Sequence, residues 1–388
     1  MIDLDANATT ALHPEVLDAM LPWLKTHHAN PSGSYTGAKQ ARQAIDRARE
    51  QVARLLNAKA EEMVFTSGGT ESANAALLSM EQVYGERRGI TSVIEHSAVL
   101  RCAEQMRNPP LRASVMANGV LDLTDFEIQL DQASWVSVML ANNETGVLQP
   151  LAEIVRLAHA RGIPVHSDAV QAVGKLPIDV RQLGVDFLSI SAHKFHGPKG
   201  VGALFVREGI EFRPMLWGGG QESGRRSGTE NTASIVGMGV AAELAIRALE
   251  NAEHIPRLAQ MRDAFETFLL EKVSGVQRNG DLVSRLPNTS HLSFSKCDAS
   301  GMLILLDDLG VACSAGSACM TGKQKPSHVQ LAMGISAEQA KTSLRFSFSR
   351  LNTLQEAQEA AQRVARAVEK LRRVQGSGIG PVSVYQAP

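Results

Sequence analysis

The chain has 388 residues, 44% of them hydrophobic, and this exceeds the size at which a single core usually keeps growing, so two domains are expected. Its 39 Lys and Arg residues balance 40 Asp and Glu residues to a formal net charge of −1. This balance excludes a global field that would attract nucleic acid or an anionic membrane, and favours a small-molecule partner. Neither a basic leader with an apolar run nor a stretch of about 18 apolar residues is evident, which predicts a cytoplasmic protein.

Four cysteines occur along the chain, at Cys102, Cys297, Cys313 and Cys319. Their spacing matches neither a disulfide framework nor the paired CxxC pattern of a zinc site, so we predict no metal. A functional cysteine in this chain is therefore expected to be reactive rather than bridging.

Short apolar or β-branched runs alternate with amphipathic helical stretches between residues 61 and 206, which predicts an α/β fold with a mostly parallel sheet. Apolar residues at three- and four-residue spacing predict helices at 71–80 and 151–162. The expected strands are 61–67, 91–97, 135–143, 162–168, 185–193 and 201–206. Polar and glycine-bearing segments follow several of these strands, at the edge where open α/β sheets bind ligands.

A long helical region over residues 232–272 is expected to connect this sheet to a second domain. Strand, helix and strand signals follow from residue 286, and a final helix is expected at 354–374. We predict a large domain over residues 15–255 and a smaller α+β domain formed by 1–14 and 256–388. The segment after residue 375 is rich in Gly, Ser and Pro and is expected to be a loose surface segment.

Lys194 follows a buried strand in SISAHKFHGPKG and is expected to face the ligand crevice. A lone lysine at a strand end is more often a surface residue, but a crevice lysine with a depressed pKa forms Schiff bases with carbonyl cofactors such as pyridoxal phosphate. Such a cofactor also needs a carboxylate at its ring nitrogen, and Asp168 in PVHSDAVQ ends a strand. A helix N-cap is an equally good interpretation of Asp168 alone.

A phosphate group needs backbone N–H groups at a helix start, and TSGGTESAN supplies Gly69 and Thr70 between a strand and a helix. Many turns carry Gly-Gly only for backbone conformation, so this loop is a weak indication alone. His96 in IEHSAVL could stack on a flat cofactor, although single histidines are more often structural. Asn143 in ANNETG is expected at the end of another strand.

Taken together, these segments resemble the class V aminotransferase superfamily and, within it, the cysteine desulfurases of the nitrogen-fixation and iron–sulfur-cluster type. The resemblance runs in order along nearly the whole chain. It is carried by LDANATT, NPSGSY, FTSGGTES, EHSAV, ANNETG, HSDAVQAVGK, SAHKFHGPKG, GGGQESGRRSGTEN, LPNT, AGSACMTGKQKPSHV and LRFSFSR. It implies a fold-type-I enzyme of pyridoxal 5′-phosphate, with a mostly parallel seven-stranded sheet in the large domain.

The resemblance also implies a role for each matching position. Lys194 would hold the cofactor covalently, Asp168 would pair with its ring nitrogen, Gln171 with its phenolic oxygen, and His96 would stack on the ring. The phosphate would be held by Gly69, Thr70, Ser191 and His193. Thr229 would reach the phosphate site of a neighbouring subunit, which implies a homodimer with shared active sites.

Two further positions concern the substrate. Arg345 in LRFSFSR would grip the substrate carboxylate, with help from Asn143, because a planar guanidinium suits two-pronged binding. Cys319 would take the sulfur of L-cysteine as a persulfide and pass it to an acceptor protein, while L-alanine is released. Lys323 and Lys325 near it would favour the reactive thiolate. An incidental cysteine without a function is the better interpretation of Cys313, Cys102 and Cys297.

Three departures from the family pattern leave alternatives open. Tyr35 stands where many desulfurases have histidine, Ser223 replaces an arginine, and MTGKQKP differs from the usual loop after the cysteine. Tyr35, with MLANNETG and HKFHGP, also resembles selenocysteine lyases, so L-selenocysteine is a second candidate substrate. An aminotransferase of the same superfamily would need no cysteine loop, and a sulfur carrier without activity would not need Lys194 and Asp168 together.

Overall fold

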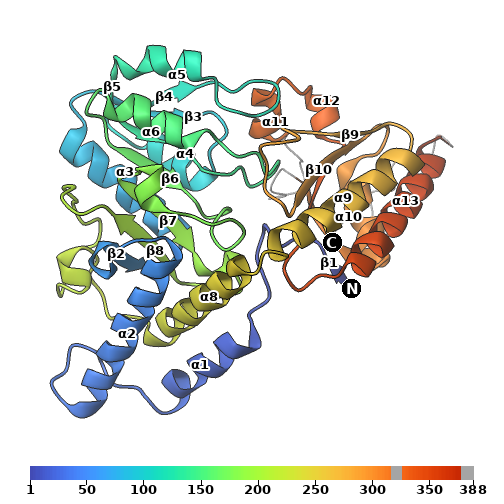
Figure 1. Cartoon of the computed structure of the whole chain (residues 1–388). Helices are drawn as coiled ribbons and strands as arrows, with labels where there is room; N and C mark the ends of the chain where they lie inside the picture. Colours follow the sequence, from blue (N-terminus) through green and yellow to red (C-terminus); the bar gives the residue numbers. More distant parts are fainter. Residues whose placement is uncertain (316–325, 377–388) are drawn as a thin grey trace, which may run out of the picture.

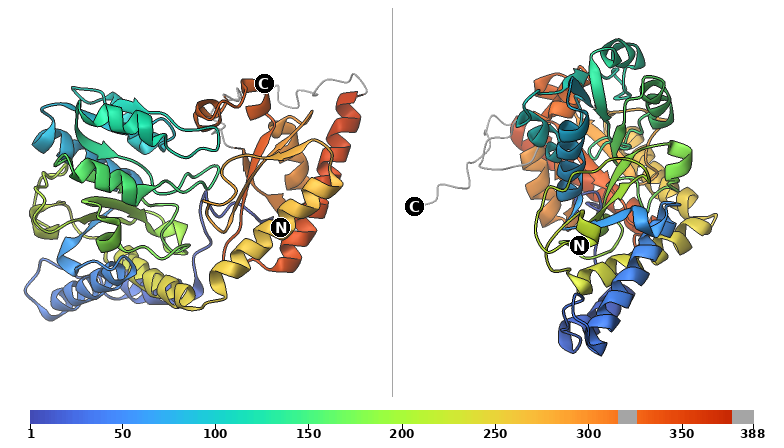
Figure 2. Two further views of the ribbon diagram at one scale, coloured as in Figure 1. Left: turned by 45° about the horizontal axis from the view of Figure 1, so that its top comes forward. Right: turned by 90° about the vertical axis from the view of Figure 1, so that its left-hand side faces the viewer.

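The computed structural model describes residues 1–315 and 326–376. Cys319, Lys323, Lys325 and the C-terminal segment 377–388 lie outside the described residues, so the predictions for them stay predictions. The described chain forms two lobes joined along one side by a pair of long helices (Figures 1 and 2).

The larger lobe is built on a seven-stranded sheet with the order β2-β8-β7-β6-β5-β3-β4. Its strands are β2 (Met63–Thr66), β3 (Arg88–Ser92), β4 (Leu111–Ala113), β5 (Ala133–Ser137), β6 (Val165–Asp168), β7 (Phe187–Ser191) and β8 (Gly202–Val206). Strand β8 is antiparallel to both β2 and β7, and all other neighbours are parallel. The predicted mostly parallel seven-stranded sheet is confirmed.

Both faces of this sheet are buried. Successive side chains of a strand point to opposite faces, so neighbouring residues show what covers each face. Phe65 and Phe205 pack into one large apolar cluster, while their neighbours Val64 and Leu204 pack into a second. The first cluster includes side chains of α2 (Thr36–Leu55), α6 (Leu151–His159) and α8 (Thr232–Glu250). The second is covered by α3 (Gly69–Tyr84) and α4 (Ser97–Glu104). Helices therefore sandwich the sheet, as expected for a parallel α/β fold.

Several expected strand bounds were wrong. The segment 91–97 was predicted as a strand, but β3 covers residues 88–92, so His96 follows it in a loop. Likewise β5 ends at Ser137 and not at Asn143, and the three-residue edge strand β4 was missed. Both His96 and Asn143 lie beyond the carboxyl ends of their strands, where the chain is free to shape a binding site.

The smaller lobe contains a four-stranded antiparallel sheet, order β12-β13-β10-β9. Its strands are β9 (Val276–Arg278), β10 (Thr289–Phe294), β12 (Ser314–Ala315) and β13 (Ser343–Ser347). A separate parallel pair joins β1 (Ile2–Asp3) to β11 (Val311–Ala312), so the N-terminus packs on this lobe. Leu4 and Phe346 share its apolar cluster with side chains of α9 (His254–Lys272) and α13 (Leu354–Gly376). The boundaries at residues 15 and 255 stay predictions.

The expected connector is two helices, α8 and α9, with a break between them. Contrary to the expectation that no membrane-length apolar stretch exists, α8 is long and apolar enough to cross a membrane by length and composition, but 56% of its 18-residue apolar stretch is buried inside the protein. It packs against α2 and α1 (Pro14–Lys25), and Met238, Ala241 and Ala242 lie in the main core. This is the environment of a core helix.

The remaining helices are short. They are α5 (Leu123–Leu130), α7 (Val180–Leu183), α10 (Ala299–Asp308), α11 (His328–Ala332) and α12 (Ala337–Ala340).

Candidate active site

A cavity of about 230 Å³ lies at the carboxyl ends of the parallel strands. Nine residues predicted for the site line it, together with Ala98, Met139, Ala141 and Val170. The nine are Gly69, Thr70, His96, Asn143, Asp168, Gln171, Ser191, His193 and Lys194. Residues that are up to 125 positions apart in sequence (194 minus 69) therefore share one site.

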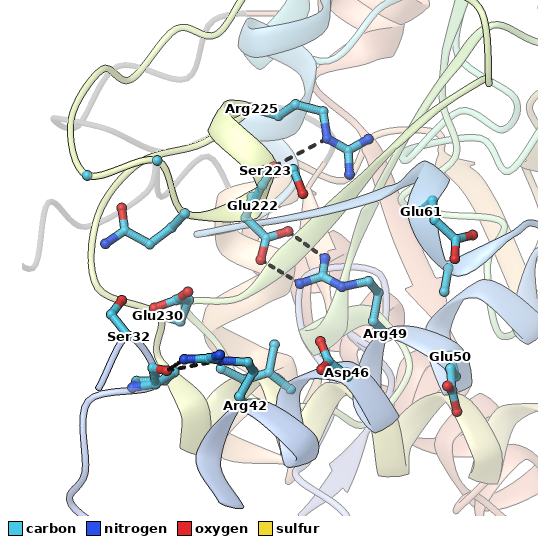
Figure 3. Close-up of a pocket in the computed structure, with 16 residues that line it drawn as sticks. Ser32, Arg42, Asp46, Arg49, Glu50, Glu61, Glu222, Ser223, Arg225 and Glu230 are labelled. Atoms are coloured by element: carbon cyan, nitrogen blue, oxygen red, sulfur yellow. Dashed lines mark hydrogen bonds and ion pairs between the residues drawn. The ribbon is translucent and has the colours of Figure 1, made fainter. Parts of the chain in front are cut away.

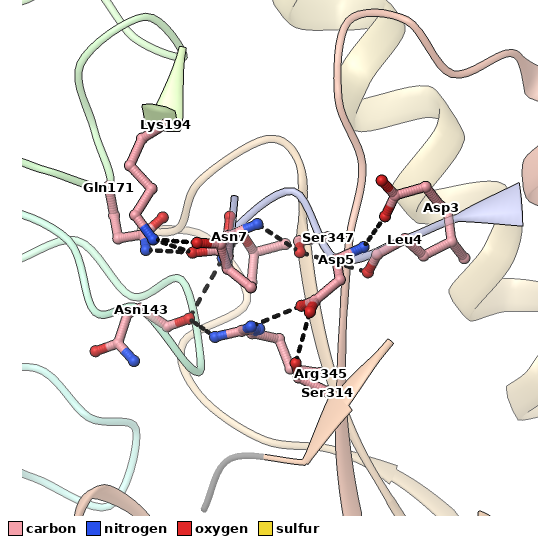
Figure 4. Close-up of polar contacts among 12 residues, drawn as sticks. Asp3, Leu4, Asp5, Asn7, Asn143, Gln171, Lys194, Ser314, Arg345 and Ser347 are labelled. Atoms are coloured by element: carbon pink, nitrogen blue, oxygen red, sulfur yellow. Dashed lines mark hydrogen bonds and ion pairs between the residues drawn. The ribbon is translucent and has the colours of Figure 1, made fainter. Parts of the chain in front are cut away.

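Lys194 ends a short 3₁₀ helix, Ala192–Lys194, that directly follows β7. Its Nζ donates hydrogen bonds to the carbonyl oxygens of Asn7 and Ala8, each at 2.7 Å (Figure 4). The pKa of Lys194 is lowered to about 8, mainly by burial and also by the positive charge of Arg345, while Asp168 and Asp5 oppose the shift. A lysine with such a pKa keeps a useful fraction of free, nucleophilic amine near neutral pH.

Asp168 is the last residue of β6 and is buried. Turns rather than a helix follow it, so the helix N-cap interpretation is wrong, although its Oδ1 accepts a hydrogen bond from Val170 N at 2.9 Å. Burial raises the pKa of Asp168, and the nearby His96 and Lys194 lower it. A buried carboxylate that faces a cavity suits a cationic ring N–H of a ligand.

The Gly-Gly loop, predicted to bind the phosphate, is closely packed at its backbone. Helix α3 begins at Gly69, and a Cβ on that residue would lie 2.7 Å from Val170 Cγ2. Only glycine fits there without a shift, and the first N–H groups of α3 are unpaired within the helix. Together with buried Ser191 and half-buried His193, these amides form a donor set that fits a phosphate group.

His96 is the N-cap of α4, and its Nδ1 accepts a hydrogen bond from Ala98 N at 3.1 Å. This contact orients an exposed imidazole ring at the cavity edge, compatible with the predicted stacking. Asn143 is half-buried, and its carbonyl oxygen accepts hydrogen bonds from Arg345 Nη1 at 2.9 Å and Asn7 Nδ2 at 3.4 Å. The side chains lining the cavity fit a flat cofactor with a phosphate, an aldehyde and a ring nitrogen.

Arg345 lies beside this cavity and does not line it. Its Nη2 pairs with Asp5 Oδ1 at 2.7 Å, and its buried Nε has no hydrogen-bond partner among residues 1–315 and 326–376. Ser314 Oγ donates to the other oxygen of Asp5 at 2.8 Å. A buried guanidinium with one unpaired N–H retains capacity for a further anion.

Thr229 is exposed and lines a different cavity, while Cys319 lies outside the described residues. The described cysteines are poor nucleophiles. Burial raises the pKa of Cys102 to about 11 and also raises those of Cys297 and Cys313. A raised pKa keeps a thiol protonated, which disfavours attack by any of the three.

Two residues essential to the geometry of this site were missed by sequence reasoning. Asn7 is 1% exposed, and its backbone oxygen accepts hydrogen bonds from both Lys194 and Gln171. Lys175 is 6% exposed and donates to Asn7 Oδ1 and Gln171 Oε1. Both belong to motifs that carry the family resemblance, LDANATT and HSDAVQAVGK, but nothing in the sequence indicates what their side chains contact.

A larger hollow, of about 790 Å³, lies elsewhere, between α2 and the glycine-rich segment 219–223 (Figure 3). Within it Arg49 forms a two-pronged ion pair with Glu222, and Arg42 donates to the carbonyl oxygen of Pro31. None of the predicted site residues that the structure describes lines this hollow. Its size therefore does not make it the site of the chemistry.

The chain matches the class-V aminotransferase family over residues 2–359. It is 43% identical over 387 residues to the cysteine desulfurase NifS of Azotobacter vinelandii, covering 98% of this chain and 96% of that protein. The solved NifS-like protein of Rickettsia africae is similar with a TM-score of 0.87 and 33% identity, covering 95% of this chain and 99% of that one.

A solved structure of SspA in complex with cysteine is also similar, with a TM-score of 0.78 and 34% identity, covering 90% of this chain and 99% of that one. Members of this family use pyridoxal 5′-phosphate, which the donor set of the cavity fits. The chain therefore belongs to the class-V aminotransferase family and, within it, to the cysteine desulfurases.

Proposed function

We propose that this protein removes sulfur from L-cysteine with the help of pyridoxal 5′-phosphate, releasing L-alanine and leaving a persulfide on Cys319. The proposal rests on one observation: a lysine amine, a buried carboxylate and the N-terminus of a helix that begins with glycine line the same cavity. These are Lys194, Asp168 and Gly69. The similarity to cysteine desulfurases over nearly the whole chain supports cysteine as the substrate.

Different residues of the cavity would bind different groups of the cofactor. Lys194 would bind its aldehyde carbon, Asp168 its ring nitrogen, and the amides at the start of α3 its phosphate. When bound, pyridoxal phosphate supplies an electron sink that stabilises negative charge at the substrate α-carbon. Lys194, with its pKa lowered to about 8, can then accept the α-proton and return a proton later.

Arg345 binds the substrate carboxylate in this proposal. Asp5 already pairs with one guanidinium nitrogen, so a substrate carboxylate must either share the guanidinium or displace Asp5. The Nε of Arg345, which has no partner within the part of the chain that the structure describes, favours sharing. Asn143, whose backbone oxygen holds Arg345 Nη1, links this arginine to the cavity wall.

The sulfur step balances without any oxidant. Cysteine and the thiol of Cys319 give L-alanine and a persulfide: the two sulfur atoms lose one electron each, and the substrate Cβ gains both as its C–S bond is replaced by a C–H bond. The Cβ–S bond breaks, the S–S bond forms, and the carbon fragment takes up protons. An acceptor protein then takes the terminal sulfur.

The test measures alanine and sulfide release from L-cysteine and alanine and selenide release from L-selenocysteine, with a reductant and no keto acid. We expect wild type to convert cysteine, Cys319→Ala to fail, and Cys313→Ala, the matched control, to retain activity. Reaction of selenocysteine alone would instead identify a selenocysteine lyase. Alanine formation only with a keto-acid acceptor would indicate an aminotransferase and contradict the proposal.

We further propose a homodimer in which Thr229 completes the partner's site. Its exposed position outside the cavity supports this arrangement. Mixed dimers of Lys194→Ala and Thr229→Val chains test it, because one site in each mixed dimer then has both wild-type residues. Restored activity on mixing supports the shared site, whereas activity no higher than that of the separate variants contradicts it.

A further inference from the structure

Lys175 is a buried lysine behind the cavity wall, and it has no role in the chemistry described so far. Its Nζ donates hydrogen bonds to Gln171 Oε1 at 2.9 Å and to Asn7 Oδ1 at 2.7 Å. Both acceptors are neutral amide oxygens rather than carboxylates. Burial lowers the pKa of Lys175 well below its usual range, and the cations Lys194 and Arg345 lower it further.

The two contacts fix which way the amide of Gln171 faces. The amine of Lys175 has at least two N–H groups in either protonation state, and it donates one of them to the oxygen of Gln171. The backbone oxygen of Asn7 only accepts, and it receives a hydrogen bond from Gln171 Nε2 at 2.9 Å (Figure 4). The second N–H of Gln171 is thereby left for an acceptor in the cavity that Gln171 lines.

A purely structural role explains this arrangement poorly. Burying an amine without a carboxylate costs free energy, and an apolar side chain of similar length would fill the space at lower cost. The contacts of Lys175 are with the two residues that shape the donor side of the cavity, Gln171 and Asn7. The backbone oxygen of Asn7 also accepts a hydrogen bond from Lys194, so Asn7 links Lys175 to the reactive amine.

We propose that Lys175 is a positioning residue, which holds the amide of Gln171 so that its N–H group is presented to the phenolic oxygen of the cofactor. This inference rests on the proposed function, since it requires pyridoxal phosphate in the cavity. Without Lys175, the oxygen of Gln171 loses its donor and the amide is held by the backbone oxygen of Asn7 alone. Its second N–H is then no longer fixed toward the phenolic oxygen, and the hydrogen bond to that oxygen weakens.

A spectroscopic signature follows from this arrangement. In the holoenzyme, the visible absorbance of the cofactor would report the protonation state of the Lys194 nitrogen that holds it. A donor to the phenolic oxygen stabilises the more negative, deprotonated form and so lowers the pH midpoint of the absorbance change. Loss of one charge-assisted hydrogen bond corresponds to an upward shift of about one unit.

The experiment titrates the absorbance of four purified holoenzymes: wild type, Lys175→Met, Gln171→Met and the double variant. We expect both single variants to raise the midpoint by about one unit, and the double variant to raise it no further, because both act through one hydrogen bond. The matched control is Asn288→Ser. Asn288 also donates to Asn7 Oδ1, at 3.3 Å, without contacting Gln171, and its loss should leave the midpoint unchanged.

The outcomes separate the inference from the proposed function. Additive shifts in the double variant would overturn positioning, since Lys175 would then act through its own charge. An unchanged midpoint in Lys175→Met would also overturn it, while cysteine turnover by wild type would leave the proposed function standing. If Lys175→Met does not fold, Lys175→Gln retains a donor for Gln171, and its midpoint should stay near that of wild type. A wild type that binds no cofactor overturns both.

Discussion

The reactive amine of Lys194 should titrate near pH 8 in the cofactor-free protein. A shift from the ordinary value of 10.5 to about 8 raises the free-amine fraction at pH 7 by about 300-fold, because each pKa unit is tenfold. Burial causes most of the shift, and the positive charge of Arg345 adds to it, whereas Asp168 and Asp5 oppose it. Replacing a neighbour should therefore move the midpoint in a direction set by its charge.

The assay is pulsed acetylation of the apoprotein from pH 6 to 11, with the modified fraction of each lysine measured by mass spectrometry. Arg345→Met should raise the midpoint of Lys194, and Asp168→Asn should lower it. Exposed Lys25 in the same digest corrects for the reagent. A wild-type midpoint at pH 10 or above, or shifts of the same sign in both variants, would refute the electrostatic reasoning.

Three further substitutions test other parts of the structure. Glu222→Ala removes the ion-pair partner of the partly buried Arg49, so denaturant unfolding should show a free energy of unfolding lower by about 3–5 kcal/mol. A decrease below about 1 kcal/mol would contradict a structural ion pair. Burial raises the pKa of Glu95 to about 8, so the native state holds its proton more tightly than the unfolded chain, and stability falls as pH rises from about 4.5 to 8. Glu95→Gln should thus raise the melting temperature at pH 9 but not at pH 4, and equal effects at both would refute this. Gly69→Ala should weaken cofactor binding by roughly tenfold to a hundredfold, because the new Cβ would meet Val170 and shift the start of α3. An unchanged dissociation constant of the cofactor would count against the phosphate site.

Much of the candidate site could be predicted because it depends on local sequence signals at strand ends. Lys194, Asp168 and Gly69 each border a strand of the same parallel sheet, and the carboxyl ends of parallel strands meet at one edge. Their convergence therefore needed no knowledge of side-chain contacts. Arg345 also has a motif of its own, but its position beside the cavity, paired with Asp5, depends on how the two lobes meet.

The errors have physical causes as well. Apolar and polar side chains do not alternate clearly over residues 88–97. Hydrophobic periodicity therefore could not decide that β3 ends at Ser92 rather than near His96. β4 has only three residues, too few for any period to show. Lys175 could not be recognised because a lysine in a turn is usually solvated, and only tertiary packing buries this one.

The N-terminal segment, residues 4–8, connects the electrostatics of the site to the packing of the smaller lobe. Leu4 is fully buried in the cluster of that lobe, while Asp5 holds Arg345 and the backbone oxygen of Asn7 holds Lys194. Asn7 N also donates to Ser347 Oγ on β13, at 2.9 Å. A displacement of the smaller lobe must therefore move the acceptor of the reactive amine and the counter-ion of the arginine together. Lys194 and Arg345, which would contact the substrate amine and carboxylate, are thus both positioned by one short segment. Their relative spacing therefore depends on how the two lobes pack together.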